Sequence, residues 1–409
     1  MVAFIQCSDM LILMIRRFVF SVKPFQFAFI SALLLFSGQT AWSYPSFIGY
    51  GYKSCMTCHY NGHGSGALND YGRSLFAVEI ASRAIYDKNV TDDELGQRSG
   101  FLGKTEIPWG LRPGLKYRGL YYATNPGSST SKRSYIWMQG DVSLAIQFDQ
   151  DQKYVAVATG GYLPAQRGSD GSEENKNRIV SREMYVRWNV KEGYFLYAGL
   201  MDKIYGLRIV DHTAYSRAQT GNGQNDQTQG IALQYIGDNK EISGHAYIGN
   251  SQQPSDLRQK GFSGMFEYDL SEDSRIGTSV LSSSNDYINW LRFAGHGKRK
   301  FGKGNSLLGE FGIIQNKPKS NGDLETGNYG MAEAMLYIRR GYNFISQVEY
   351  YNRTGSTKSA DETKWSFGLL AFPMPKTEFR FNLVNGRNIS DTGVSPDVWS
   401  AQTQLHLSL

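Results

Sequence analysis

From residue 111 to the end of the sequence, polar and apolar residues alternate over long segments. In 376–387 three apolar residues alternate with three polar or charged ones: Phe379, Phe381 and Leu383 with Glu378, Arg380 and Asn382. In 134–148 the same pattern places Ile136 and Leu144 on the apolar face, and Tyr135 and Gln147 on the polar face. Successive side chains of a strand point to opposite faces, so each segment predicts a strand with one apolar face.

Sixteen β segments follow one another, and most reach ten residues; several alternate cleanly, whereas others such as 286–296 alternate poorly. Strands of globular proteins average about five or six residues, whereas a membrane-crossing strand needs about nine to eleven. The lengths therefore favour a membrane barrel over a soluble sandwich. The predicted strands are 111–124, 134–148, 152–164, 178–190, 193–203, 227–236, 241–250, 261–270, 273–283, 286–296, 306–316, 327–338, 341–353, 362–373, 376–387 and 397–409.

The connections between these segments alternate in length. Tight ones such as 191–192 alternate with long ones such as 165–177, although a tight connection at 284–285 and a loose one at 297–305 break the pattern. Outer-membrane barrels have short periplasmic turns and longer external loops. We therefore predict an all-β fold, a transmembrane antiparallel β-barrel of about 16 strands, over residues 105–409.

The N-terminus has the anatomy of a secretory signal peptide. Arg16, Arg17 and Lys23 precede the apolar run 27–36, and the small-x-small sequence 41–43 follows it. The apolar run is too short to span a bilayer as a helix. We predict a signal peptide over 1–43 and an outer-membrane location. No long apolar stretch follows residue 43, which excludes a helical membrane protein.

Residues 55–59 read Cys-Met-Thr-Cys-His, the attachment pattern for haem c. Cys55 and Cys58 are expected to bind one haem c covalently, and His59 is expected to be an axial ligand of its iron. A zinc site would require a second Cys/His pair at suitable spacing, for which there are no further cysteines downstream. A thioredoxin-like redox pair would lie within a βαβ unit. The sequence shows neither. We assign 44–104 to a small α-helical module carrying the haem.

The far face of the haem has no obvious ligand within this module. His63 is a weak candidate, because it follows His59 by only four residues in a glycine-rich loop. A barrel residue, the loop that holds His212, or an open sixth site are the alternatives. A helix is expected over 68–86, and Thr91 begins a capping box with Glu94.

A C-x-x-C-H in a short N-terminal module before a barrel resembles the fused monohaem cytochrome–porins of the outer membrane, known from iron-oxidising bacteria. Residues 68–73, Leu-Asn-Asp-Tyr-Gly-Arg, add a weaker likeness. The resemblance implies electron transfer between the cell exterior and the periplasm, with a periplasmic electron-carrier protein and an external electron donor or acceptor as partners. The alternatives are a solute porin whose haem module is a plug or gate, and a gas-binding or peroxidase-like haem.

Strand order places the module at the short-turn, periplasmic mouth. A single haem there would leave most of the roughly 30 Å hydrocarbon core uncrossed, so we expect the module inside the lumen. The connection 204–226 is the third external loop, and in sixteen-stranded porins the corresponding loop often folds inward; the alternative is a solvated surface loop.

The chain carries a formal charge of +6 from 43 basic and 37 acidic residues, which does not indicate nucleic-acid binding. The basic run at 298–303 is expected on the periplasmic rim, where it is a solvated turn or a docking site for an acidic carrier protein. No hydrolytic motif is present, so the expected role is that of an electron carrier, with outer-membrane lipid around it.

We predict that Cys55→Ala and Cys58→Ala, singly or together, leave a barrel that inserts but largely loses covalent haem, because the strands do not depend on the two thioether bonds. Haem staining of denaturing gels measures this. Equal staining of the double variant and the unaltered protein would contradict the haem c assignment.

Overall fold

The computed structural model describes residues 45–64, 66–86, 89–103, 110–125, 131–163, 178–354, 361–390, 393–394 and 397–409. The predicted signal peptide lies outside these residues. Before the barrel come 3₁₀ turns η1 (Pro45–Tyr50), η2 (Cys55–Thr57) and η4 (Phe101–Gly103), helices α3 (Asp70–Leu75) and α4 (Asp92–Gln97), and the π-helical turn η3 (Phe76–Ile80).

The described strands closely match the predicted ones. They are β1 (Leu111–Thr124), β2 (Lys132–Gln147), β3 (Tyr154–Leu163), β4 (Arg178–Lys191), β5 (Tyr194–Met201), β6 (Thr228–Ile236), β7 (Lys240–Gly249), β8 (Lys260–Ser271), β9 (Ser274–Ser284), β10 (Ile288–Lys300), β11 (Ser306–Pro318), β12 (Glu325–Arg339), β13 (Tyr342–Asn352), β14 (Asp361–Met374), β15 (Thr377–Ser390), β16 (Gly393–Val394) and β17 (Val398–Ser408).

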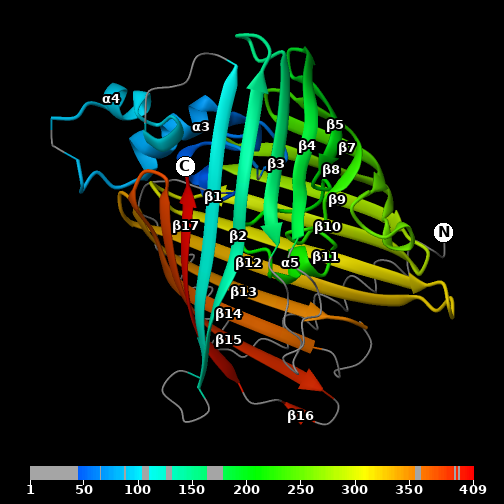
Figure 1. Cartoon of the computed structure of the whole chain (residues 1–409). Helices are drawn as coiled ribbons and strands as arrows, with labels where there is room; N and C mark the ends of the chain where they lie inside the picture. The colour runs from blue at the N-terminus through cyan, green and yellow to red at the C-terminus, as the bar shows by residue number, and fades with distance from the viewer. Residues whose placement is uncertain are drawn as a thin grey trace. The chain divides into compact units, whose positions relative to one another are not determined.

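These strands form one closed antiparallel barrel. Each long strand pairs with its chain neighbour, and β17 pairs with both β15 and β1. The closing register runs from Lys116 opposite Ser408 to Thr124 opposite Ser400. The two-residue β16 only extends β15, so sixteen of the seventeen described strands make the wall. Figure 1 shows β1, β2 and β17 side by side where the ring closes.

The two rims differ as predicted. We call the rim where β1 begins and β17 ends the short-turn rim, and the opposite one the loop rim. The two connections that broke the predicted pattern are explained by β10, which starts later than predicted, at Ile288, and continues to Lys300. The connection after it therefore shrinks to 301–305 on the short-turn rim. The link between β9 and β10 is simply a short loop on the loop rim.

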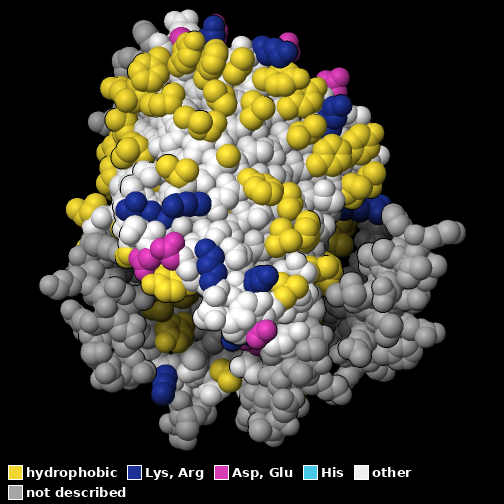
Figure 2. All heavy atoms as spheres, turned by 90° about the vertical axis from the view of Figure 1, so that its right-hand side faces the viewer, with side chains coloured by type: hydrophobic (Ala, Val, Ile, Leu, Met, Phe, Trp, Pro, Cys, Tyr) yellow, Lys and Arg dark blue, Asp and Glu magenta, His cyan; other side chains and the backbone are white. Residues whose placement is uncertain are grey.

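The wall is apolar outside and polar inside. In β7 the buried residues Glu241, Ser243 and His245 face the lumen and alternate with exposed ones such as Ile242 and Ile248. Figure 2 shows hydrophobic side chains gathered over the outer face, with charged ones along the upper rim and in a belt below. This alternation is the pattern of a lipid-facing barrel.

One register differs from the prediction. The pairing of β1 with β2 skips Met138, a bulge that shifts the alternation by one residue. Leu144 faces outward and Gln147 inward, as predicted, but Tyr135 lies on the outer face and is 58% exposed. The inner-face prediction for Tyr135 is therefore wrong.

The basic run at 298–303 is also placed differently from the prediction. Lys298 lies within β10 and faces the lumen, where its Nζ is 2.6 Å from Glu267 Oε1. Lys300 pairs with Asp273 at the short-turn rim. β10 extends four residues beyond the predicted strand. The docking site predicted on the rim therefore lacks Lys298.

The long connection between β5 and β6 folds into the lumen. Its residues Leu207, Ile209 and Ala214 are buried against Leu308 and Met331 of the wall. The short helix α5 (Tyr215–Ala218) follows. Of the two interpretations that the sequence left open, the inward loop is confirmed and the solvated surface loop is wrong. Among the described residues no helix has the length and apolarity that crossing a membrane requires.

Phe381 and Asn382 test the two faces of the wall at one depth, because they are neighbours in β15. Phe381 is 42% exposed on the outer face, whereas Asn382 faces the lumen. We predict that Phe381→Arg lowers the free energy of unfolding by about 2–4 kcal/mol in lipid vesicles, because a charge would face the hydrocarbon. Asn382→Arg is the control and should cost much less; equal losses would contradict the register of β15.

Candidate functional site

The helices before the barrel begin as predicted but end sooner. Asn69 caps α3, its side chain accepting a hydrogen bond from Gly72 N, and Thr91 and Glu94 form the predicted capping box of α4. The helix expected over 68–86 ends at Ile80, because Ala81 is extended. Beyond that point the backbone bonds to the wall: Ser82 N donates to Phe372 O at 2.8 Å, and Arg340 donates to Ala81 O.

The C-x-x-C-H residues form one tight turn. The amides of Cys58 and His59 both donate to Cys55 O, at 3.2 and 3.0 Å. This helical spacing brings Cys55, Cys58 and His59 to the same cavity. His59 also pairs with Leu68 in an isolated antiparallel bridge, which ties the turn to the start of α3.

The Leu-Asn-Asp-Tyr-Gly-Arg sequence supports this turn from behind. Asn69 Nδ2 donates to the carbonyls of Met56 and Thr57, at 3.3 and 3.1 Å. A Cβ on Gly72 would lie 2.3 Å from Cys58 O, so only glycine lets α3 approach so closely. The likeness in 68–73 thus has a structural reason: these residues hold the C-x-x-C-H turn in place.

The N-terminal segment, residues 45–103, is bonded to the inner wall of the barrel. Asp70 accepts two hydrogen bonds from Arg112 of β1, at 2.7 and 2.8 Å. Lys53 pairs with Asp269 of β8 at 3.1 Å. Tyr60 is fully buried, and its hydroxyl accepts a hydrogen bond from Gln147 at 2.7 Å. The two ion pairs are partly buried and charge-assisted, and together with the buried Tyr60–Gln147 bond they fix the segment to the wall.

Part of this segment reaches the middle of the barrel. The carbonyl of Gly66 accepts a hydrogen bond from Lys116, the sixth of fourteen residues in β1. Gly66 also lies against the carboxylate of Glu183, the sixth of fourteen in β4. β1 starts at the short-turn rim and β4 starts at the loop rim, so these two positions are counted from opposite rims. Both contacts therefore lie near the middle of their strands. The N-terminal segment therefore enters the lumen, whereas α3 and α4 lie at the short-turn rim (Figure 1).

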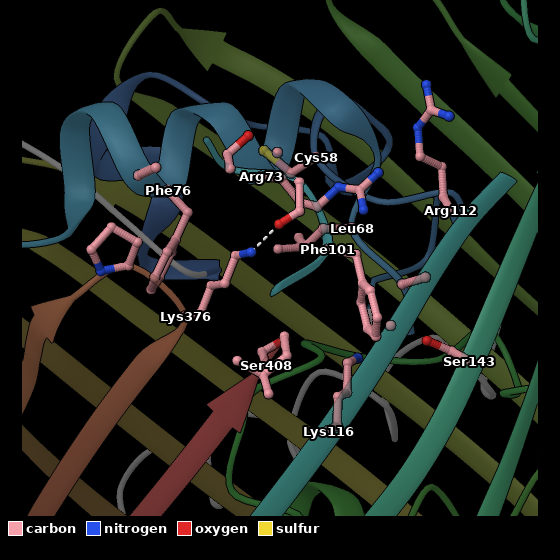
Figure 3. Close-up of a pocket in the computed structure, with 18 of the residues that line it drawn as sticks. Cys58, Leu68, Arg73, Phe76, Phe101, Arg112, Lys116, Ser143, Lys376 and Ser408 are labelled. Carbon is pink, nitrogen blue, oxygen red and sulfur yellow. Dashed lines mark hydrogen bonds between the residues drawn. The ribbon is translucent and has the colours of Figure 1, made fainter. Parts of the chain in front are cut away.

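Two cavities meet at Cys58 and His59. The first lies between the α3–η3 helix and the wall and holds about 1160 Å³, including space open to solvent; it is largely apolar, with Leu68, Leu75 and Phe76 among its lining residues. Figure 3 shows Cys58, Arg73 and Phe76 on its helical side, with Lys116, Lys376 and Ser408 on the barrel side. Lys376 donates a hydrogen bond to Gly100 O across it.

The second cavity is larger and charged. It holds about 1680 Å³, including space open to the lumen, and reaches from Cys55 to the inward loop. Its basic residues include Lys116, Arg118, Arg182, Arg208, Arg217 and Lys298. Its acidic residues include Asp141, Glu183, Asp202, Glu241 and Glu267.

Some of the buried polar atoms without a hydrogen-bond partner line the second cavity. Among the described residues these include both ring nitrogens of His63, Thr159 Oγ1, Arg182 Nη2, Glu183 Oε2, Arg208 Nε and His406 Nε2. Folded proteins leave few such atoms unsatisfied. A polar or anionic occupant would satisfy the arginines and the histidines.

These features fit a haem bound at the C-x-x-C-H turn. The apolar cavity suits the porphyrin macrocycle, and the arginines of the second cavity suit the two carboxylates of the haem. Burial raises the pKa of the Cys55 thiol to about 11 and that of Cys58 to about 12. Reactive redox cysteines have lowered pKa values, so the two thiols do not resemble a thiol–disulfide redox pair.

The structure brings the predicted site residues together. Cys55, Cys58, His59 and His63 all line the second cavity, and so does His212 of the inward loop. Burial lowers the pKa of His63 to about 3, which keeps its ring neutral. His406 of β17 lines both cavities and was not among the residues predicted from sequence. Its only signal was its place on the inner face of the last strand.

The comparisons with known proteins concern the barrel. The chain matches no protein-family model and no curated protein. Its fold is similar to OmpT of Vibrio cholerae, with a TM-score of 0.57 and 7% identity over 73% of this chain and 97% of that one. An anion-selective porin from Comamonas acidovorans has a TM-score of 0.54 and 11% identity, over 73% of this chain and 99% of that one. The outer-membrane channel DcaP of Acinetobacter baumannii has a TM-score of 0.53 and 10% identity, over 73% of this chain and 97% of that one.

At these identities the likeness establishes the fold, a closed sixteen-stranded barrel of the outer-membrane porin type. The resemblance to cytochrome–porins is thereby supported for its porin half. The haem-carrying half rests on the C-x-x-C-H turn and the cavities around it.

Gly72 tests how the turn is held. We predict that Gly72→Ala destabilises the N-terminal segment by about 1–3 kcal/mol, because the added methyl group would displace the backbone of Cys58. Limited proteolysis in detergent should then cleave the segment at least about fivefold faster, while the barrel stays resistant. Tyr71→Phe removes an exposed hydroxyl and its 2.9 Å hydrogen bond to the Tyr52 hydroxyl without disturbing the backbone of Cys58, and is the control. Unchanged cleavage in Gly72→Ala would show that the close approach is not needed.

Proposed function

We propose that this protein resides in the outer membrane and carries electrons between the cell exterior and the periplasm through one haem c held inside its barrel. The observation that supports this most directly is the C-x-x-C-H turn, which lies inside the barrel where an apolar cavity and a charged cavity meet. The outward apolar face of the wall suits a lipid bilayer.

The residues of this site have distinct roles. The thiols of Cys55 and Cys58 would hold the haem, each adding S–H across a vinyl group with formation of a C–S and a C–H bond and no leaving group. His59 would give a ring nitrogen to the iron. The bound haem supplies a one-electron redox couple, with a potential set by its ligands and surroundings. Arg182 and Arg208 offer partners for the haem carboxylates.

Depth is the second argument for electron transfer. The hydrocarbon core is about 30 Å thick, and tunnelling weakens steeply with distance. A site inside the lumen shortens that distance for an external donor or acceptor and stays close to a periplasmic electron-carrier protein at the short-turn rim. The segment extends from this rim, where Asp70 bonds Arg112, to the Lys116–Glu183 level at Gly66.

A second candidate is a solute porin with a haem-containing plug or gate. The fold likeness to porins and channels favours it, because it concerns the wall and not the segment inside. In this function the N-terminal segment and the inward loop would limit the pore, and the haem would be structural. The two candidates differ in what crosses the barrel.

Vesicles separate the two candidates. The protein is inserted with its loop rim outward, ferricytochrome c is enclosed, and a reductant too large to pass either the bilayer or the barrel is added outside. We expect reduction of the enclosed ferricytochrome c and low solute conductance. The double variant Cys55→Ala/Cys58→Ala is the control and should transfer no electrons. High solute flux with no reduction of the enclosed protein would favour the solute porin.

A further inference from the structure

His406 is a buried histidine on the inner wall of the barrel. It stands opposite Glu378 in the pairing of β15 with β17, and its Nδ1 lies 3.2 Å from Glu378 Oε2. A carboxylate only accepts hydrogen bonds, so Nδ1 carries the proton. In the neutral ring the lone pair then lies on Nε2, which is buried and has no hydrogen-bond partner.

This arrangement is the one that proteins give to a metal-binding imidazole. A ligating histidine almost always donates its other ring N–H to a carboxylate or a carbonyl, which fixes the tautomer and the orientation of the ring. Here the strand ladder places Glu378 beside His406, so the carboxylate is positioned by the fold itself. Glu378 is only 3% exposed.

His406 also has the right neighbour. It and His59 both line the apolar cavity and the charged cavity, and they come from different parts of the fold, the wall and the N-terminal segment. The second ligand must reach the opposite face of the haem. A residue that follows the first ligand by only a few positions cannot easily do so, which favours a ligand from a separate element. His63 follows His59 by four positions, a separation of at most about 13–14 Å when the chain is fully extended.

The remaining histidines fit less well. His63 lines only the charged cavity, and its ring packs at 5.6 Å on that of Tyr197. His212 also lines only the charged cavity. His245 and His296 line neither cavity, and His296 already bonds Glu267 at 2.9 Å. With His59 and His406, these complete the six histidines of the sequence.

The methionines offer no better choice. Met56 lies between the two cysteines, and its sulfur accepts hydrogen bonds from Arg187 and Tyr197. Met265 lines only the charged cavity and packs against the hydrophobic cluster around Tyr60.

We propose that His406 is the second axial ligand of the haem iron, through Nε2, and that Glu378 is a positioning residue that holds its ring. This inference rests on the proposed haem c site and goes beyond it by naming the sixth ligand. The haem is then six-coordinate, which suits an electron carrier and excludes an open site for gas binding. It also joins the N-terminal segment to the barrel wall through the iron.

The test is the visible spectrum of the full-length protein in detergent, with and without the histidine. The unaltered protein should be low-spin, and His406→Ala should be high-spin, returning to low-spin on addition of imidazole. His406→Met should stay low-spin with an altered spectrum. His245→Ala is the matched control, a buried lumen histidine away from both cavities, and should leave the spectrum unchanged.

The outcomes distinguish this inference from the proposed function. Loss of haem staining from the unaltered protein after denaturation would defeat the haem c site itself. Covalent haem with a low-spin spectrum in His406→Ala, or a low-spin spectrum lost in His63→Ala, His212→Ala or Met265→Ala instead, would overturn only the ligand assignment. A high-spin spectrum of the unaltered protein would overturn it too. Heat-dependent migration on gels shows that each variant keeps its barrel.

Glu378→Gln tests the positioning role separately. It keeps a hydrogen-bonding group but removes the charge that makes the imidazole a stronger donor. We expect a low-spin spectrum with a higher midpoint potential, because the oxidised iron loses stabilisation. An unchanged potential would show that Glu378 does not act through the ligand.

Discussion

The rest of this structure depends on the pairing of β1 with β17. A bilayer offers no water to unpaired backbone groups, so a sheet can cross it only when its edges are joined. Residues 116–124 and 400–408 make that junction, although they are almost three hundred positions apart in the sequence. Closing the ring also creates an interior, and the alternation that turns apolar side chains to lipid turns polar ones toward that interior.

A polar lumen of sixteen strands is wide, and here two parts of the chain fill it from different ends. The inward loop packs through Leu207 and Ile209 against β11 and β12. The N-terminal segment packs through Tyr60 against β2, β4 and β5. The charged cavity lies where both meet, with Cys55 on one side and Arg208 and Arg217 on the other. Neither part alone encloses the site.

Sequence predicted the wall better than its contents. Alternation in 376–409 assigned the faces of Phe381 and Asn382 because burial in a barrel follows the strand period of two. It failed at Tyr135, because the bulge at Met138 has no signal in the composition. It also ended β10 too early, because Lys298 faces a charged lumen and a lysine at that position is typical of a turn. Local signals also found the C-x-x-C-H turn and the caps at Asn69 and Thr91. They did not find His406, whose importance depends on a fold that brings residue 406 beside residue 59.

In the proposed haem site, the sixth ligand comes from the wall and not from the described part of the N-terminal segment, and this architecture offers a physical explanation. A free-standing cytochrome must enclose its haem with its own residues, whereas this segment of about sixty residues is too short to do so and lies against a ready-made wall. Arg112, Gln147 and Lys116 of the barrel already hold it by hydrogen bonds to Asp70, Tyr60 and Gly66. A wall that supplies the packing surface and the hydrogen bonds can also supply a ligand. Haem binding would then be coupled to insertion of the segment into the closed barrel, and a detached segment would lack both its support and its second axial histidine.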